Sequence, residues 1–246
     1  MIARYLLFTK FFLVASVLAS SCTNPTSRNP ILLFNGKGTS PNDVKAIEEI
    51  LRSNHFGYSL VNSGELDRLT LDELKSYRLL IMPGGNFIEM GKSIDEETTK
   101  RVRKAVYDGL SYLGICAGGF LAGDTRSNSF NLANGRQFKF YSDEEKGIRK
   151  EAVAITNADG TIIENYWEDG PAFSGWGDIV SRYPDGSPAT VEGNYGSGFV
   201  LLTGVHPEAP QSWRNEFRFS TPVEKSHEYA SLLLRVALNR RKMDHF

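Results

Sequence analysis

Residues 110–122 read LSYLGICAGGFLA, and they pass from one apolar run through a glycine-flanked cysteine into a second apolar run. The first run is typical of a buried strand, and the second is typical of the start of a helix. Gly114 and Gly118 flank Cys116 in the pattern of a nucleophile elbow, a strand-to-helix turn too sharp for side chains two residues either side of the nucleophile. The N–H groups and dipole at the start of the helix favour a thiolate. We therefore predict Cys116 as a nucleophile, with a structural cysteine in a glycine-rich turn as the alternative.

The sequence on both sides of this turn alternates between strand and helix patterns. Three short apolar runs precede it: Ile31–Phe34, Tyr58–Val61 and Arg78–Met82. A helix signal follows each run: the cap Ser40-Pro41, the capping box Thr70–Glu73, and the amphipathic residues 93–108. Shorter strands then follow at 151–155, 161–163 and 198–203, before a closing helix at 224–240. The βαβα alternation predicts a parallel sheet with helices on both faces, whose sites form beyond the carboxyl ends of the strands.

Composition narrows the class of protein. The 246 residues include 28 Lys+Arg and 29 Asp+Glu, for a net charge of -1. This balance lacks the basic excess of a nucleic-acid binder, and we predict no nucleic-acid partner. The two cysteines exclude a disulfide scaffold, and no CxxC pair offers a zinc site. We therefore predict no metal and no organic cofactor.

The first 21 residues have the organisation of a secretory signal. Arg4 and Lys10 are followed by the apolar run Phe11–Ala19 and then by small residues. The uncharged run is short of the roughly 20 residues that a membrane-spanning helix needs. We therefore predict export, with residues 1–21 as a signal peptide.

Cys22 follows Leu18-Ala19-Ser20-Ser21, and this segment resembles a bacterial lipoprotein box. The resemblance implies that Cys22 is diacylated as the mature N-terminus and anchors the protein at the periplasmic face of a bacterial membrane. It is incomplete, because the box usually has a large aliphatic residue where Ala19 stands. Residues 22–30 are typical of a flexible tether, and residues 31–240 read as one domain. Soluble export and a disulfide between Cys22 and Cys116 are the alternatives.

A nucleophilic thiolate needs a base and a group that orients the base. His206 follows the apolar run 199–205, so it is expected at a strand's carboxyl end, as Cys116 is. Glu208 stands two residues later, where its carboxylate can hold the ring tautomer. We expect the other three histidines at the surface: His55 and His227 in helical or helix-end settings, and His245 in a frayed C-terminus. We predict that Cys116, His206 and Glu208 are catalytic and line a surface cleft.

Acyl transfer also needs donors for an oxyanion. The N–H of Ala117 is one candidate, because it follows the nucleophile. Gly84 or Gly85 is the other, because both follow a predicted strand. Three aromatic residues are candidates for the substrate pocket, with a place in the core as the equal alternative: Tyr166, Trp167 and Phe173.

Three segments in this order resemble the oxyanion strand, the nucleophile elbow and the His-x-Glu motif of class I glutamine amidotransferase-like domains: Pro83–Gly85, Gly114–Gly118 and Gly204–Glu208. The resemblance implies a flavodoxin-like three-layer α/β/α sandwich with a mostly parallel sheet. Within this superfamily, residues 165–173 and 193–198 are most similar to the amidotransferase-like domain at the N-terminus of some eukaryotic biotin–protein ligases.

The sequence departs from the family pattern beside the elbow. Glutamine-using members usually continue with Gly-His-Gln, whereas this chain has Gly118-Gly119-Phe120, which disfavours glutamine as the substrate. The protease and stress-response branch has His directly after the cysteine, where this chain has Ala117. We expect an exported cysteine-dependent hydrolase that acts on a C–N amide or related acyl bond of a small-molecule or peptide-like substrate. A non-catalytic ligand-binding or scaffold domain on the same fold is the alternative. Neither the substrate nor the oligomeric state can be predicted from the sequence.

Overall fold

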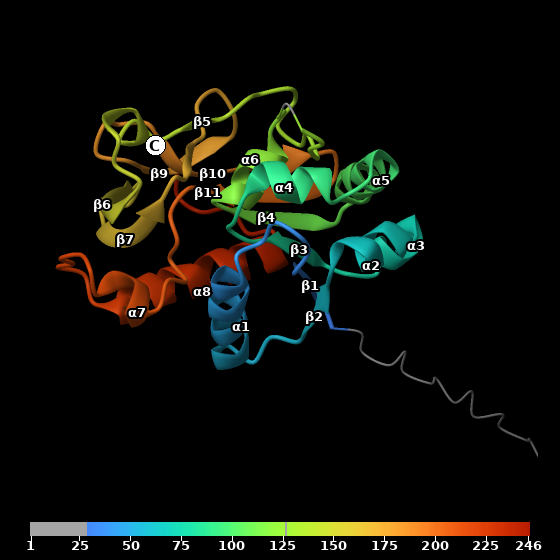
Figure 1. Cartoon of the computed structure of the whole chain (residues 1–246), viewed down its shortest axis with the longest axis horizontal. Coiled ribbons are helices and arrows are strands. Elements are labelled where there is room, and N and C mark those ends of the chain that lie inside the picture. The colour runs from blue at the N-terminus through green and yellow to red at the C-terminus, as the bar shows by residue number, and fades with distance from the viewer. Residues whose placement is uncertain (1–28, 126) are drawn as a thin grey trace, which may run out of the picture.

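A nine-stranded sheet organises the computed structural model, which describes residues 29–125 and 127–246 (Figure 1). Its strand order is β2-β1-β3-β4-β11-β10-β9-β6-β7. The predicted signal peptide, Cys22 and most of the predicted tether lie outside the described residues. Within the described part of the chain, no helix is long and apolar enough to cross a membrane.

The first half of the sheet is parallel and the second half is antiparallel. The parallel strands are β1 (Ile31–Phe34), β2 (Tyr58–Val61), β3 (Leu79–Met82), β4 (Ser111–Ile115) and β11 (Gly198–Thr203). The antiparallel strands are β6 (Lys150–Asn157), β7 (Ile162–Glu168), β9 (Asp178–Arg182) and β10 (Pro188–Tyr195). The predicted α/β class and parallel core are confirmed. Short turns rather than helices join the later strands, and such connections suit antiparallel pairing.

Helices cover both faces of the sheet. One face carries α1 (Pro41–Ser53) and α8 (Val223–Asn239), with the short α7 (Gln211–Arg214) bonded to α8. The other face carries α2 (Ser63–Arg68), α3 (Leu71–Lys75), α4 (Phe87–Lys92), α5 (Glu96–Tyr107) and α6 (Ala117–Ala122). Successive strand residues alternate between the two cores, so Leu33 packs with α1 while Leu32 packs on the opposite side.

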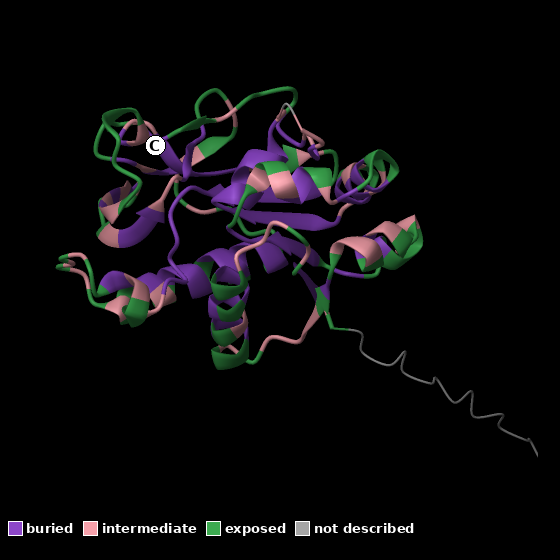
Figure 2. Ribbon diagram, viewed as in Figure 1, coloured by how far each residue is buried: buried purple, intermediate pink, exposed green. Residues whose placement is uncertain are grey.

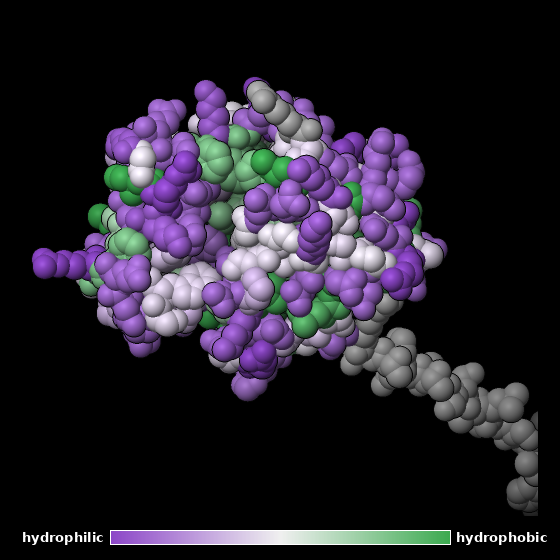
Figure 3. All heavy atoms as spheres, in the orientation of Figure 1, coloured by the Kyte–Doolittle hydropathy of each residue, from purple (hydrophilic) through white to green (hydrophobic). Residues whose placement is uncertain are grey.

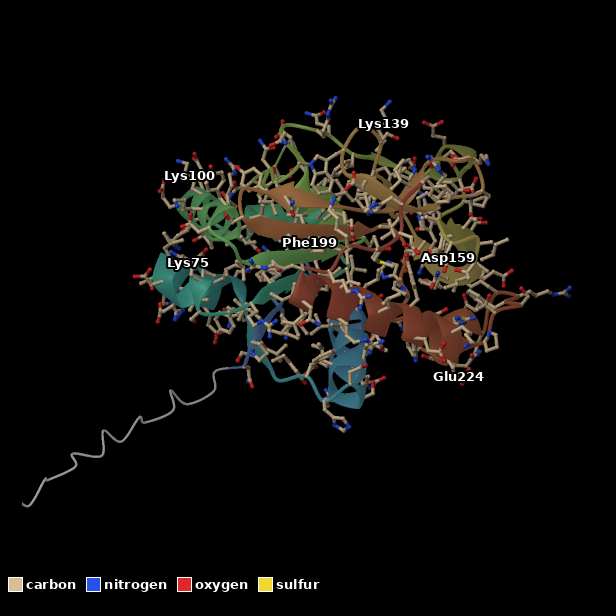
Figure 4. All side chains as sticks on the ribbon, turned by 180° about the vertical axis from the view of Figure 1, so that it is seen from behind. Lys75, Lys100, Lys139, Asp159, Phe199 and Glu224 are labelled. Carbon is tan, nitrogen blue, oxygen red and sulfur yellow. The ribbon has the colours of Figure 1, made fainter. Side chains whose placement is uncertain are left out.

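Burial follows this layering. Figure 2 shows the central strands buried and the outer helical surfaces exposed. Seen from behind, Phe199 lies in the middle of the molecule, whereas Lys75, Lys100 and Lys139 lie at its edge (Figure 4). A small ladder of β5 (Lys139–Phe140) and β8 (Pro171–Ala172), with the single turn η1 (Glu144–Lys146), lies outside the main sheet.

The helix ends show how local chemistry sets the elements. The predicted cap Ser40 accepts a hydrogen bond from Asp43 N, and the predicted capping box of Thr70 with Glu73 opens α3. The helix predicted over residues 93–108 is shorter in the structure, where α5 spans Glu96–Tyr107. Asp95 caps α5, and the preceding α4 is a separate helix.

The chain end differs from its prediction. His245 was expected at a frayed terminus, but its Nε2 lies 2.8 Å from Oε1 of the buried Glu192, and Phe246 N donates to Ile179 O at 3.0 Å. The prediction of a frayed end is therefore wrong, because a buried carboxylate on β10 binds the tail.

Candidate active site

Cys116 occupies a strained turn between β4 and α6. Its backbone angles are φ 49° and ψ −106°, outside the regions that L-residues favour, which is the geometry expected of a nucleophile elbow. A Cβ on Gly114 would collide with the backbone of Gly118, and a Cβ on Gly118 would collide with the carbonyl of Met82. Such backbone strain typically costs about 1–3 kcal/mol and occurs mainly at functional sites.

His206 lies at the end of β11, beside the elbow. Cys116 N donates to Thr203 O at 2.8 Å, which joins the two strand ends. Nδ1 of His206 lies 2.9 Å from Oε1 of Glu208, and Cys116 lies close enough to the ring for each group to shift the pKa of the other. Because the carboxylate occupies the Nδ1 side, Nε2 is the nitrogen left for the thiol. The structure thus brings together the predicted Cys116, His206 and Glu208.

A second carboxylate, which the sequence did not reveal, faces the same nitrogen. Asp43 comes from the first turn of α1, and its Oδ1 lies 3.1 Å from Nδ1 of His206. From the sequence, Asp43 is expected only to lie in the first turn of the helix that Ser40 and Pro41 open. Its position after β1 was the available signal, because the first turns of helices that follow parallel strands lie at the same edge of the sheet as the strand ends.

The predicted surface cleft is wrong. Cys116 and His206 are only 6% and 4% exposed, because the end of β7 covers them. The thiol donates to the backbone carbonyl of Glu168 at 3.4 Å, and His206 N donates to Tyr166 O at 2.8 Å. The nucleophile is therefore enclosed by main chain in this structure.

Burial and neighbouring charges shift the pKa values of the site in different directions. Burial raises the pKa of the Cys116 thiol, although the His206 ring opposes this shift. Burial alone would lower the pKa of His206, but the negative charges of Cys116, Glu208 and Asp43 together raise it well above its ordinary value. Burial also raises the pKa of Glu208, whereas the His206 cation overcomes burial and lowers the pKa of Asp43.

The candidate oxyanion donors lie on the two segments that meet at the site. The N–H groups of Gly84, Gly85 and Ala117 have no acceptor among the described residues. Pro83 O accepts a hydrogen bond from Gly118 N at 3.1 Å, which joins the glycine segment, Pro83–Gly85, to the elbow. A Cβ on Gly84 would collide with His206 Cε1, so this residue lies directly against the ring.

The three predicted pocket aromatics separate into two groups. Trp167 and Phe173 are fully buried on opposite faces of the sheet, so they are core residues. Tyr166 lies beside the site, with its ring edge-on to His206 at 6.0 Å between centroids. The partly exposed Trp213, which the sequence did not single out, lies 6.1 Å from His206 and 5.6 Å from Tyr166.

A groove with aromatic and polar lining residues lies between α4 and α6. Phe120, four residues after Cys116, stacks on Phe87 at 4.6 Å, and both line a groove of about 650 Å³. Phe140 packs edge-on against Phe120 at 4.9 Å between centroids. Figure 3 shows apolar side chains gathered in a hollow over α6 and β5, and further apolar patches elsewhere on this face.

Asp43, His206 and Glu208 are also the described residues placed closely enough to share a metal ion, with one ligand atom each within 4.8 Å of the others. Both carboxylates face Nδ1, which would have to lose its proton to bind an ion. We therefore assign both carboxylates to the imidazole.

Comparisons with known proteins agree with this fold. The family model described as "Biotin-protein ligase, N terminal" matches residues 29–161. The biotin–protein ligase of Schizosaccharomyces pombe is 26% identical over 211 residues, which cover 72% of this chain and 33% of the ligase. The chain therefore spans about a third of that ligase. Pyridoxal 5'-phosphate synthase subunit PdxT of Streptococcus pneumoniae is 31% identical over 144 residues, which cover 52% of this chain and 67% of PdxT.

Two solved structures are similar in fold. A crystal structure of a glutamine amidotransferase aligns with a TM-score of 0.57 at 18% identity, covering 85% of this chain and 98% of that one. A glutamine amidotransferase from Thermotoga maritima aligns with a TM-score of 0.56 at 15% identity, covering 86% and 97% of the two chains. At these identities the likeness shows the fold alone.

Proposed function

The chain belongs to the biotin-protein ligase N-terminal family, and from this premise we propose that it is a cysteine-dependent hydrolase acting on a C–N amide or related acyl bond. One observation carries the proposal. A strained cysteine at a strand end faces a histidine whose other nitrogen is bound by a buried carboxylate. This arrangement of nucleophile, base and orienting group is the one that acyl transfer requires.

The reaction proceeds in two steps. The Cys116 proton passes to His206, and the thiolate attacks the substrate carbonyl to form a tetrahedral oxyanion. The N–H groups of Ala117 and of Gly84 or Gly85 stabilise that oxyanion. The C–N bond then breaks as His206 returns the proton to the leaving nitrogen, which leaves a thioester on Cys116. In the second step His206 deprotonates a water that attacks the thioester, and the acid and free thiol are released.

The surroundings of Cys116 bear on the substrate. Glutamine-using amidotransferase-like domains usually have Gly-His-Gln after the elbow, whereas this chain has Gly118-Gly119-Phe120, so glutamine is disfavoured. The groove lined by Phe87 and Phe120 contains no residue of the Cys116–His206–Glu208 site, so it does not define the substrate. We therefore infer a small-molecule or peptide-like amide without specifying its side group.

A non-catalytic ligand-binding domain is the second candidate, and one observation favours it. The thiol is buried and donates to Glu168 O, and burial raises its pKa, which disfavours the thiolate. Under this alternative the enclosed site binds a ligand without a covalent step.

The rate of Cys116 alkylation separates the two candidates. The full chain would be treated with iodoacetamide between pH 5 and 10, and the peptide that contains Cys116 would be quantified by mass spectrometry. A catalytic cysteine should show a reactive fraction below the ordinary thiol pKa of about 8.5, through pairing with His206. A single inflection at or above that value, together with no amine release from a panel of small amides, would favour binding alone.

We further propose that the protein is exported and held at a bacterial membrane through Cys22. Support comes from the order of the basic, apolar and small residues in 1–21. In that setting the substrate would be met outside the cytoplasm.

A further inference from the structure

The Asp43 carboxylate is buried against His206 without a hydrogen bond of its own to the ring. Glu208 Oε1 accepts the hydrogen bond from Nδ1 at 2.9 Å. Asp43 Oδ1, 3.1 Å from the same nitrogen, has no hydrogen-bond partner among the described residues. Asp43 is 6% exposed, and a buried carboxylate is costly unless an opposite charge lies beside it. The protonated imidazole of His206 is the cation that meets this need.

Backbone contacts hold Asp43 in place. Ser40 N donates to Gly84 O at 3.1 Å, and Asn86 N donates to Gly38 O at 2.8 Å, so the start of α1 is tied to the glycine segment after β3. A Cβ on Gly84 would collide with Asp43 Oδ1 as well as with the ring. The absence of a side chain at position 84 therefore lets the carboxylate and the imidazole meet.

We propose that Asp43 is a positioning residue that acts with Glu208 to hold His206 as an imidazolium whose Nε2–H is directed at Cys116. Its catalytic meaning rests on the proposed hydrolysis, in which the imidazolium donates the proton to the leaving nitrogen. With two carboxylates on one ring, the proton that leaves the thiol stays on His206. The reactive form is then a thiolate–imidazolium pair.

The charged and titratable groups around the ring are consistent with this role. Asp43 faces it from α1, Glu208 from the segment after β11, Cys116 from the elbow, and Tyr166 from β7. In the reactive form Asp43, Glu208 and Cys116 carry negative charge. The His206 ring, which they surround, is the cation. The lowered pKa of Asp43, which the His206 cation causes against the effect of burial, points the same way.

A purely structural role for Asp43 is the competing explanation. An acidic residue in a first helical turn interacts favourably with the helix dipole whatever it faces. Asp72, an exposed first-turn acid of α3, offers a matched control because it has the helix position without the histidine.

The test is a titration of the full chain labelled with ¹⁵N-histidine, followed by NMR. His206→Asn identifies the His206 signals among those of the four histidines. Asp43→Asn should lower the pKa of His206 by about one unit or more, a tenfold loss of proton affinity, as expected when an opposite charge within about 4–6 Å is removed. Glu208→Gln should lower it comparably, and Asp72→Asn should leave it unchanged. An unshifted His206 titration in folded Asp43→Asn would overturn the proposal.

Should Asp43→Asn not fold, the wild-type chain supplies the test. With ¹³C-labelled aspartate, the Asp43 carboxyl signal should show an inflection at the pH where His206 titrates, and a signal without that inflection would overturn the proposal. Neither measurement needs a substrate, so the absence of amide hydrolysis would refute the proposed function separately. Conversely, an unchanged pH profile of hydrolysis in Asp43→Asn would refute the positioning role alone.

Discussion

The Cys116 thiol donates a hydrogen bond to the backbone carbonyl of Glu168, 3.4 Å away, and this contact closes the nucleophile from solvent. Glu168 is the last residue of β7, and Tyr166 fixes that strand end through its backbone carbonyl and its hydroxyl. Tyr166 O accepts from His206 N at 2.8 Å, and the Tyr166 hydroxyl donates to Glu168 Oε2 at 2.9 Å. Because a carbonyl oxygen accepts from a thiol and repels a thiolate, the strand end must move before Cys116 can attack.

Tyr166→Phe should accelerate alkylation of Cys116. The substitution removes the hydroxyl bond to Glu168, and a hydrogen bond of this kind contributes about 1 kcal/mol, which is about fivefold in an opening equilibrium. Iodoacetamide labelling of the Cys116 peptide at pH 8 measures the change. Tyr195→Phe, at a ring that packs edge-on to Tyr107, is the control and should leave the rate as it is. An equal rate in both variants would show that this bond does not hold the strand end.

Substitution of the three proposed catalytic residues should lower kcat most at Cys116 and His206 and less at Glu208. On an amide found by screening, Cys116→Ala should abolish kcat, and His206→Ala should cost nearly as much, because residues that act as a unit are strongly non-additive. Glu208→Gln should be milder, since the amide oxygen still accepts from Nδ1 but stabilises the imidazolium less. Thermal melts of each variant separate chemistry from folding. Full turnover in Cys116→Ala would refute the nucleophile assignment.

Gly118→Ala should destabilise the fold. A Cβ there would collide with the backbone carbonyl of Met82, which cannot turn away without breaking the β3–β4 pairing. Overpacking of this kind costs about 1–3 kcal/mol. Gly64→Ala, whose Cβ would meet only the ends of the Arg68 and Asn62 side chains, is the control and should be neutral or slightly stabilising. Urea unfolding of both variants gives the comparison.

The stability of the protein should depend on pH through Glu151. Burial, together with the neighbouring Asp143 carboxylate, raises the pKa of Glu151 to about 7, against an ordinary value of 4.5. Between these values the folded chain holds a proton that the unfolded chain has released. The free energy of unfolding should therefore fall as pH rises from about 4.5 to about 7. Glu151→Gln should lessen this fall in the free energy of unfolding. Glu145 is an exposed acid on η1, so Glu145→Gln should leave the fall as it is. Urea unfolding midpoints at each pH measure both variants. Identical pH profiles for all three proteins would contradict the assignment.

Cys22 should be the lipidated N-terminus of the mature protein. The apolar run before it and the tether after it motivate this expectation. Intact mass of membrane-extracted protein should show a diacylglyceryl adduct and the loss of residues 1–21. Soluble protein with a free N-terminus at another residue would refute it, and Cys22→Ser should release the protein from the membrane.

The parallel half of the sheet could be predicted because several local signals agree there. The apolar runs 31–34 and 79–82 are buried on both faces, so they contain no polar residue to obscure the strand pattern. The elbow was equally clear, since Gly114 and Gly118 are required by contacts within a few residues and with the adjacent strand. The strands β9 and β10 escaped prediction because they mix polar and apolar residues, and β10 buries Thr190 and Glu192 through cover supplied by distant segments.

By itself, the sequence determined which residues end strands, and hence that Cys116, His206 and Glu208 could meet at one edge of a parallel sheet. Only the tertiary structure decided what else meets there. Asp43 reaches His206 because α1 starts at that same edge and because Gly84 leaves room between them. Glu168 O covers the thiol because β7, from the antiparallel half, ends beside the elbow. The physical reason is that strand ends and glycines are set by interactions a few residues long, whereas the partners of a buried imidazole or thiol depend on which distant segments the sheet brings against it.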